Sequence, residues 1–165
     1  MITRVDGVAH LGRLLQEQPM PSEMNKEFHY DERSVNKSFR VLTRVLMQAM
    51  RVESFVIEFM SCKEWVDRLL QALEEYHEEE VALTIVRTLK LIFRSEAGHT
   101  MCREKFPSMA EFLLMTCTQY PNAPNIKFEA ILTLEVLFRF SHFAKLIKPT
   151  WQHILAAIRR DPAMS

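Results

Sequence analysis

Glycine is scarce in this chain, and its scarcity restricts the fold more than any other feature of the sequence. Only Gly7, Gly12 and Gly98 occur in 165 residues, where an average protein would have about twelve. Gly-rich phosphate loops, the turns of dinucleotide-binding folds and tight β-hairpins need residues that tolerate positive φ or close backbone approach. The sequence therefore disfavours nucleotide-binding α/β folds and hairpin-rich β folds.

Apolar residues recur at intervals of three and four along most of the chain, which is the spacing of amphipathic helices. We predict a first helix over 5–16, a loop or linker over the proline-containing stretch 18–32, and then a regular succession of helices. The helices expected in this succession cover 34–50, 52–60, 62–75, 78–95, 99–105, 107–120, 125–140, 142–147 and 149–160. Their order, long then short then medium, occurs three times.

Local signals indicate where some of these helices begin and which side chains they bury. Ser61 and Glu64 have the spacing of a capping box, and Asn125 is a favourable N-cap residue. Val45 and Phe128 lie on the apolar stripes of their helices, so we predict that both point into the core.

Residues of successive units correspond at a nearly constant separation. Leu89 and Phe93 correspond to Leu134 and Phe138, each 45 residues later. A period of 42 to 47 residues with three helices per unit resembles the armadillo/HEAT superfamily over about three-quarters of the chain. The resemblance implies an all-α, right-handed helical solenoid of about three armadillo/HEAT-like three-helix units with an extra N-terminal helix. Because only Gly98 supplies the corner glycine that is common in armadillo units, a more general helical solenoid stays open.

The chain has the usual length of one domain. Within it, we expect an N-terminal helix and linker over 1–33 and an armadillo/HEAT-like repeat domain over 34–165. The stretch 125–130, Asn-Ile-Lys-Phe-Glu-Ala, followed by an apolar helix, is similar to the corresponding repeat of the calcium-binding protein 39 family of kinase scaffolds. That similarity implies a kinase-type partner as one candidate.

Charge and cysteine usage restrict the environment in which the chain works. Twenty-one basic residues balance twenty-one acidic ones, so no overall field attracts nucleic acid or an anionic membrane. Cys62, Cys102 and Cys117 are odd in number and form no Cys-x-x-Cys pair, which favours core residues in a reducing compartment. With no leader-like start and no long apolar segment, we expect a cytoplasmic or nuclear protein that binds neither nucleic acid nor membrane.

Candidate catalytic and metal-binding residues are few and poorly grouped. His99 and Cys102 have the spacing of two metal ligands on one helix face, but a second pair is missing, so we interpret them as a surface histidine and a core cysteine. His77 precedes the run 78–80 of three glutamates, which we interpret as a solvated corner whose later members cap the next helix. No Gly-x-Ser-x-Gly elbow is present. We therefore predict no enzyme activity, no metal and no cofactor.

The remaining candidate for function is surface shape. In a helical solenoid one helix of each unit lines a concave face, and we assign 62–75, 107–120 and 149–160 to that role. The predicted partner-binding residues on this face are Lys63, Asp67, Arg68, Gln71, Glu111, Met115, Gln119, Gln152, His153 and Arg159.

The sequence thus predicts a non-enzymatic scaffold or adaptor that binds a peptide or a folded protein, either as a monomer or as a subunit of a hetero-complex. The alternative is a structural subunit whose solenoid ends stack on neighbouring molecules, because an uncovered end repeat exposes apolar surface. A helical enzyme is the least favoured hypothesis.

Overall fold

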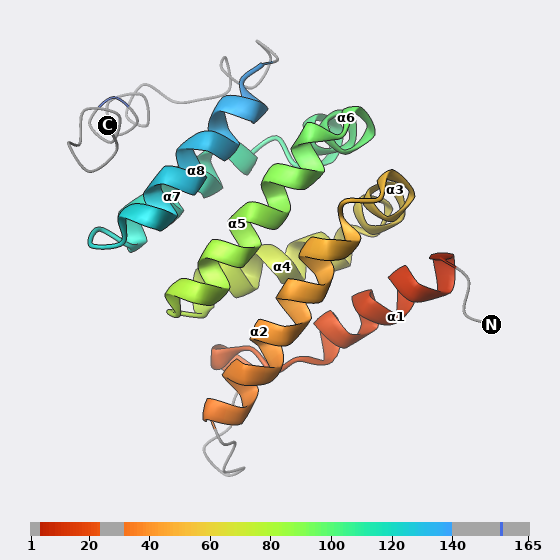
Figure 1. The fold of residues 1–165 in the computed structure, drawn as a ribbon, viewed down its shortest axis with the longest axis horizontal. Helices are drawn as coiled ribbons and strands as arrows, with labels where there is room; N and C mark the ends of the chain where they lie inside the picture. Colours follow the sequence, from red (N-terminus) through yellow and green to blue (C-terminus); the bar gives the residue numbers. More distant parts are fainter. Residues whose placement is uncertain (1–3, 24–31, 140–155, 157–165) are drawn as a thin grey trace.

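The chain folds into helices throughout the part that the computed structural model describes, which is residues 4–23, 32–139 and 156. The elements are α1 (Arg4–Glu17), the short 3-10 helix η1 (Pro21–Glu23), α2 (Glu32–Ala49), α3 (Glu53–Ser61), α4 (Lys63–Glu75), α5 (Glu79–Arg94), α6 (Glu96–Lys105), α7 (Met109–Gln119) and α8 (Pro124–Leu137) (Figure 1). The predicted all-α class is confirmed for these residues. The helices expected at 142–147 and 149–160 lie outside them, apart from position 156.

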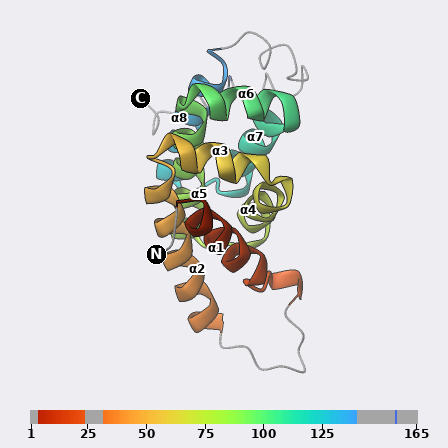
Figure 2. The same ribbon diagram turned by 90° about the vertical axis from the view of Figure 1, so that its right-hand side faces the viewer.

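Three of the longer helices, α2, α5 and α8, form one row, the long-helix row. α5 packs between α2 and α8, so that the three lie side by side (Figure 1). α4 and α7 lie in a second layer behind this row, and α3 and α6 pack on each other near one end of it (Figure 2). α1 packs mainly on α3 and α4 and diverges from α2. The predicted order of long, short and medium helices is the observed order from α2 to α7.

One hydrophobic core runs through the eight α-helices of the described residues, from Val8 in α1 to Leu137 in α8. Two side chains that were predicted to be buried are exposed instead: Val45 has 45% and Phe128 47% of its surface accessible. Val45 lies on the flank of α2 that α1 leaves uncovered, and Phe128 lies on a flank of α8 that no described helix covers. Both predictions were wrong because an apolar stripe can be wider than the surface its neighbours cover.

Two predicted helix caps are also wrong. α3 continues through Ser61, whose hydroxyl donates a hydrogen bond of 2.6 Å to the Ile57 carbonyl of its own helix, a common alternative for serine inside a helix. Cys62 is therefore the N-cap residue of α4. At the start of α8 the N-cap residue is Ala123 rather than Asn125, because Pro124 occupies the first helical position, where its missing N–H costs nothing.

Two tyrosines at equivalent positions each bond to the segment that follows an earlier helix. Tyr76 and Tyr120 follow α4 and α7 as their C-cap residues. The Tyr76 hydroxyl donates to the Pro19 carbonyl at 2.5 Å, and the Tyr120 hydroxyl donates to the Tyr76 carbonyl at 2.8 Å. The Tyr76 ring also stacks on Phe39 of α2, with 4.5 Å between ring centroids. The donor tyrosine thus recurs 44 residues along the chain, whereas the two acceptor carbonyls, of Pro19 and Tyr76, are 57 residues apart.

Candidate protein-binding surface

Ion pairs connect neighbouring helices of the long-helix row. Between α2 and α5, Arg40 pairs with Glu78 and Arg44 pairs with Glu80. The Glu run beside His77 therefore reaches across to α2, whereas the Glu78 side chain accepts no capping hydrogen bond at the start of α5. The charged side chains on this flank of α2 are occupied by contacts within the fold.

The same arrangement recurs between α5 and α8. Arg87 and Lys90 of α5 both contact the Glu129 carboxylate of α8, at 3.3 and 2.6 Å. Because Lys90 and Glu129 are both largely buried, this contact is less screened than an exposed pair.

The face predicted to bind a partner carries a small hollow between α4 and α7. Lys63 and Asp67 are exposed on α4 and line this hollow of about 240 Å³ together with Phe106, Met109 and Phe112. On α7, Glu111 and Met115 are half-buried and Gln119 is exposed. Gln152, His153 and Arg159 lie outside the described residues.

Arg68, which was predicted to contact a partner, is already engaged inside the chain. Its guanidinium donates to the Glu23 carboxylate at 2.5 and 2.8 Å and to the Gln18 carbonyl at 2.6 Å. Its neighbour Gln71 donates to Glu75 at 2.6 Å. The hydrogen bonds from Arg68 keep the pKa of Glu23 below its ordinary value. Arg68 therefore fastens the segment after α1 to α4.

We expect Arg68→Ala to lower the free energy of unfolding by about 1 kcal/mol at neutral pH, a modest value because Glu23 is partly exposed and screened by solvent. The folded-state pKa of Glu23 is lowered, so the contribution is present above the unfolded pKa and is lost as the pH falls through the folded one. Urea denaturation from about pH 7 to about pH 3 should show the difference between wild type and variant shrinking below about pH 4.5. Arg13→Ala, at an exposed arginine of α1, is the control; a pH-independent Arg68→Ala effect would contradict the assignment.

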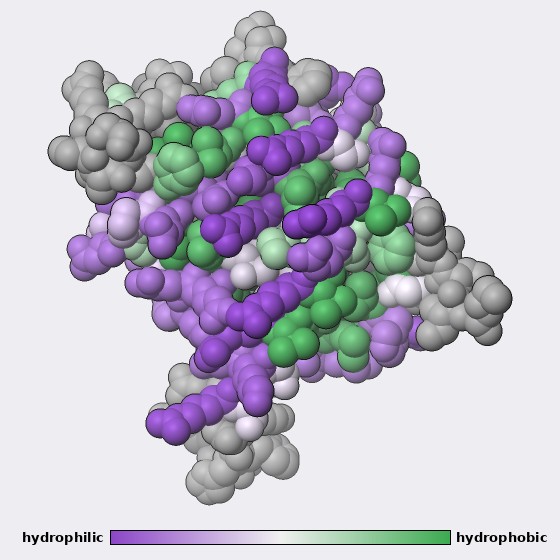
Figure 3. All heavy atoms as spheres, viewed as in Figure 1, coloured by the Kyte–Doolittle hydropathy of each residue, from purple (hydrophilic) through white to green (hydrophobic). Residues whose placement is uncertain are grey.

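A larger and more apolar groove lies between α1 and α2. It has a volume of about 500 Å³ and is lined by Leu11, Leu14, Gln18, Lys37, Ser38, Val41, Leu42 and Val45. Val41 is 52% exposed and Val45 45%. Figure 3 shows the corresponding apolar surface over α2 and α1, next to the hydrophilic surface of the long-helix row.

The groove exists because α2 has two different flanks. Arg40 and Arg44 face α5, whereas Ser38, Val41 and Val45 lie on the opposite flank, about 100° or more around the helix from Arg40. α1 approaches that flank but packs on α3 and α4 instead, so the apolar side chains stay uncovered. Val41 was not among the residues assigned to the core stripe, and its i, i+4 spacing to Val45 was the signal in the sequence that could have revealed this surface.

Another hollow, of about 490 Å³, has a different character. It lies where α2 ends beside α3 and α5, and it is bordered by Arg51, Glu53, Arg94 and Glu96. Two cations and two anions balance there. The α1–α2 groove is therefore the more apolar of the two.

His99 and Cys102 are both buried in α6, so the predicted surface position of His99 was wrong. The His99 Nε2 atom lies 3.1 Å from the Leu137 carbonyl oxygen, and burial lowers the pKa of His99. Burial raises the pKa of Cys102 to about 12 and that of Cys117 to about 11, so neither thiol is a thiolate at neutral pH. Among the described residues, no three His, Cys, Asp or Glu side chains are grouped to hold a metal.

Comparison of the chain with models of known families, with curated proteins and with solved structures gave no match. Within the described residues, no helix combines the length and apolar character needed to cross a bilayer.

Proposed function

We propose that the chain is a non-enzymatic scaffold that binds another protein in the α1–α2 groove. The observation that carries this proposal is the exposure of Val41 and Val45 in a groove of about 500 Å³. Contiguous exposed apolar surface of this kind is typical of protein interaction sites in folded domains. Binding along α4 and α7 stays a prediction from the sequence, as does a kinase-type partner.

We also propose that the architecture is a helical solenoid of the armadillo/HEAT kind. Three features support this: the row α2, α5, α8, the hydrogen bonds from two tyrosines that lie 44 residues apart, and ion pairs at both junctions of the row. In such an assembly each layer contacts its neighbours, and the outer layers keep an uncovered side. The α1–α2 groove lies on that uncovered side of α2.

Photo-crosslinking tests the proposed binding surface. A benzophenone amino acid at position 45 should join the protein to a specific partner in extracts of cells that express it, and mass spectrometry should identify the same partner repeatedly. Position 57 on α3 is the matched control, because Ile57 is also an exposed aliphatic residue, 41% accessible, but is not among the residues that line the groove. Equal labelling from both positions, or none from position 45, would refute the proposal.

End-to-end stacking of copies is the second candidate, favoured by the position of the groove at the open side of the row. Mixing isotopically heavy and light protein in the same crosslinking experiment separates the two functions. Heavy–light crosslinks from position 45 would indicate a second copy in the groove, and crosslinks to another protein support the scaffold.

A further inference from the structure

We infer that the α1–α2 groove receives a short amphipathic helix of the partner, with apolar side chains in the groove and a carboxylate beside Lys37. This inference rests on the proposed scaffold function and specifies the chemistry of what is bound.

The dimensions of the groove fit about two turns of helix. On α2, the lining residues run from Lys37 to Val45, a rise of about 12 Å at about 1.5 Å per residue. On the other wall they run from Leu11 to Gln18, a rise of about 10 Å. Apolar anchors at i, i+4 and i+7 of a bound helix would span this length, the usual arrangement for a helix in a groove.

A helix suits the groove better than an extended peptide because of its backbone. An extended segment needs partners for its N–H and C=O groups, which bound peptides commonly find at a sheet edge. The described residues contain no strand, and Gln18, Lys37 and Ser38 are the polar residues among those that line the groove. A helix satisfies its own backbone and brings only side chains to the surface.

The row of long helices offers a place for this additional helix. α5 has α2 on one side and α8 on the other, whereas the flank of α2 opposite α5 carries the uncovered Val41 and Val45. A bound helix resting on α1 and on this flank would extend the row by one member. Its apolar face would then cover Val41 and Val45, in the way that α8 covers one side of α5.

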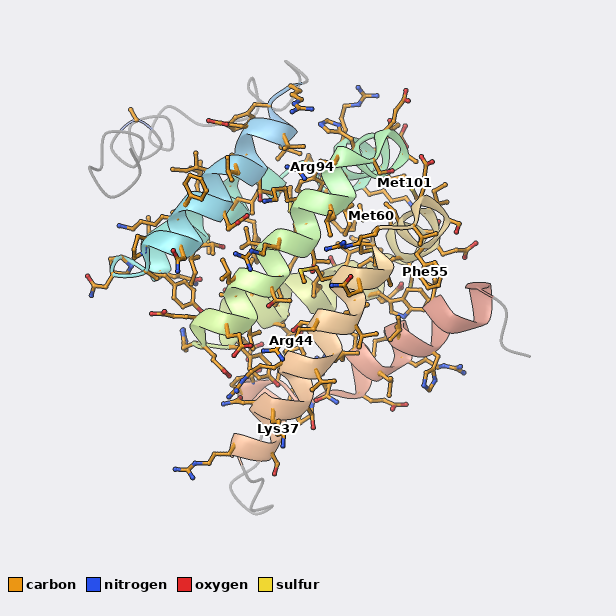
Figure 4. The ribbon with its side chains drawn as sticks, in the orientation of Figure 1. Lys37, Arg44, Phe55, Met60, Arg94 and Met101 are labelled. Atoms are coloured by element: carbon orange, nitrogen blue, oxygen red, sulfur yellow. The ribbon has the colours of Figure 1, made fainter. Side chains whose placement is uncertain are left out.

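The charge of Lys37 predicts which bound helices the groove prefers. Lys37 is the ionisable residue among those lining the groove, and it is exposed. Figure 4 shows Lys37 and Arg44 along α2, and Arg44 pairs with Glu80 of α5. A glutamate or aspartate next to the apolar anchors therefore complements the lining, whereas a lysine there would be repelled.

Two synthetic helices of about four turns provide the probe. Both carry leucines at i, i+4 and i+7, and they differ only in a glutamate or a lysine at the position that meets Lys37. Fluorescence anisotropy at low ionic strength, where exposed ion pairs are least screened, compares their binding to wild type, Val41→Glu, Lys37→Glu and the control Ile57→Glu.

We expect wild type to prefer the glutamate helix by about fivefold and Lys37→Glu to reverse that preference. Val41→Glu should weaken both helices at least about tenfold, because it places a charge against their leucines. Ile57→Glu should bind like wild type. Val41 is 52% exposed, so its variant should keep the far-UV circular dichroism of the fold. Lys37→Glu tests the preference for a carboxylate separately from the apolar contact.

Three results would overturn the inference. If neither helix binds wild type, the helical occupant is wrong, while the proposed function still depends on the crosslinking result. If both bind equally and Lys37→Glu changes nothing, carboxylate recognition is wrong although a groove sensitive to Val41→Glu remains. If light scattering finds a dimer that Val41→Glu dissociates, a second copy of the chain fills the groove.

Discussion

We expect Gly98→Ala to lower the free energy of unfolding by about 3 kcal/mol, measured by urea denaturation. A methyl group on Gly98 would lie 2.2 Å from the Ile92 carbonyl oxygen and 2.8 Å from Val56 Cγ1. The carbonyl is backbone, so relief requires a shift of α6 relative to α5. Alanine is the better helix former by about 1 kcal/mol, but the clash outweighs this gain.

Gly7→Ala is the matched control, because Gly7 is also a glycine within a helix. There the nearest atom to the new methyl group would be Phe55 Cζ at 3.8 Å, an ordinary contact. We expect this variant to be about 0.5–1 kcal/mol more stable than wild type through helix propensity alone. Equal stability of the two variants would show that α6 does not approach the end of α5 as closely as described.

The positions of the helices could be predicted because their apolar periodicity is a local property. The expected segment 78–95 differs by one residue at each end from α5, and 62–75 by one residue from α4. The surface that each apolar stripe contacts depends instead on how distant helices pack together. Leu11 and Leu14 of α1 line the open groove together with Val45, although Val45 was predicted to point into the core.

Polar contacts between distant segments could not be predicted for the same reason. Arg68 was predicted to lie on the partner-binding face, but the structure brings it to Glu23, 45 residues earlier. The Tyr120 hydroxyl finds the Tyr76 carbonyl 44 residues away. Each contact depends on how one layer of helices lies on the previous one, which periodicity within a helix does not specify.

The scarcity of glycine was interpreted as a shortage of residues for turns, but two of the glycines that are present serve helix packing. This scarcity disfavoured turn-rich folds, and Gly98 was expected to form a corner. None of the three glycines has a positive φ, and Gly98 lies inside α6 with its amide donating to the Ser95 hydroxyl oxygen at 3.3 Å. Gly98 and Gly12 are needed for close helix packing rather than for turns, so each is a sensitive position for substitution.

Gly12→Ala should loosen the attachment of α1 to the rest of the fold. A methyl group on Gly12 would lie 2.1 Å from Trp65 Cε2 and 2.3 Å from Cδ2, so the indole of α4 must move away. Trp65 also packs near Phe59, with 6.2 Å between ring centroids, which limits where it can go. We expect a loss of about 2 kcal/mol, with α1 exchanging its amide hydrogens faster than α5.

Tryptophan fluorescence locates this effect. In a Trp151→Phe background Trp65 is the sole tryptophan, and Gly12→Ala should shift its emission to longer wavelength as the indole becomes more exposed. Gly7→Ala, in the same helix, should leave the emission unchanged. Because α1 forms one wall of the groove, binding of the glutamate helix should weaken together with this shift. An unshifted emission combined with a stability gain like that of Gly7→Ala would contradict the tight packing of α1 on Trp65.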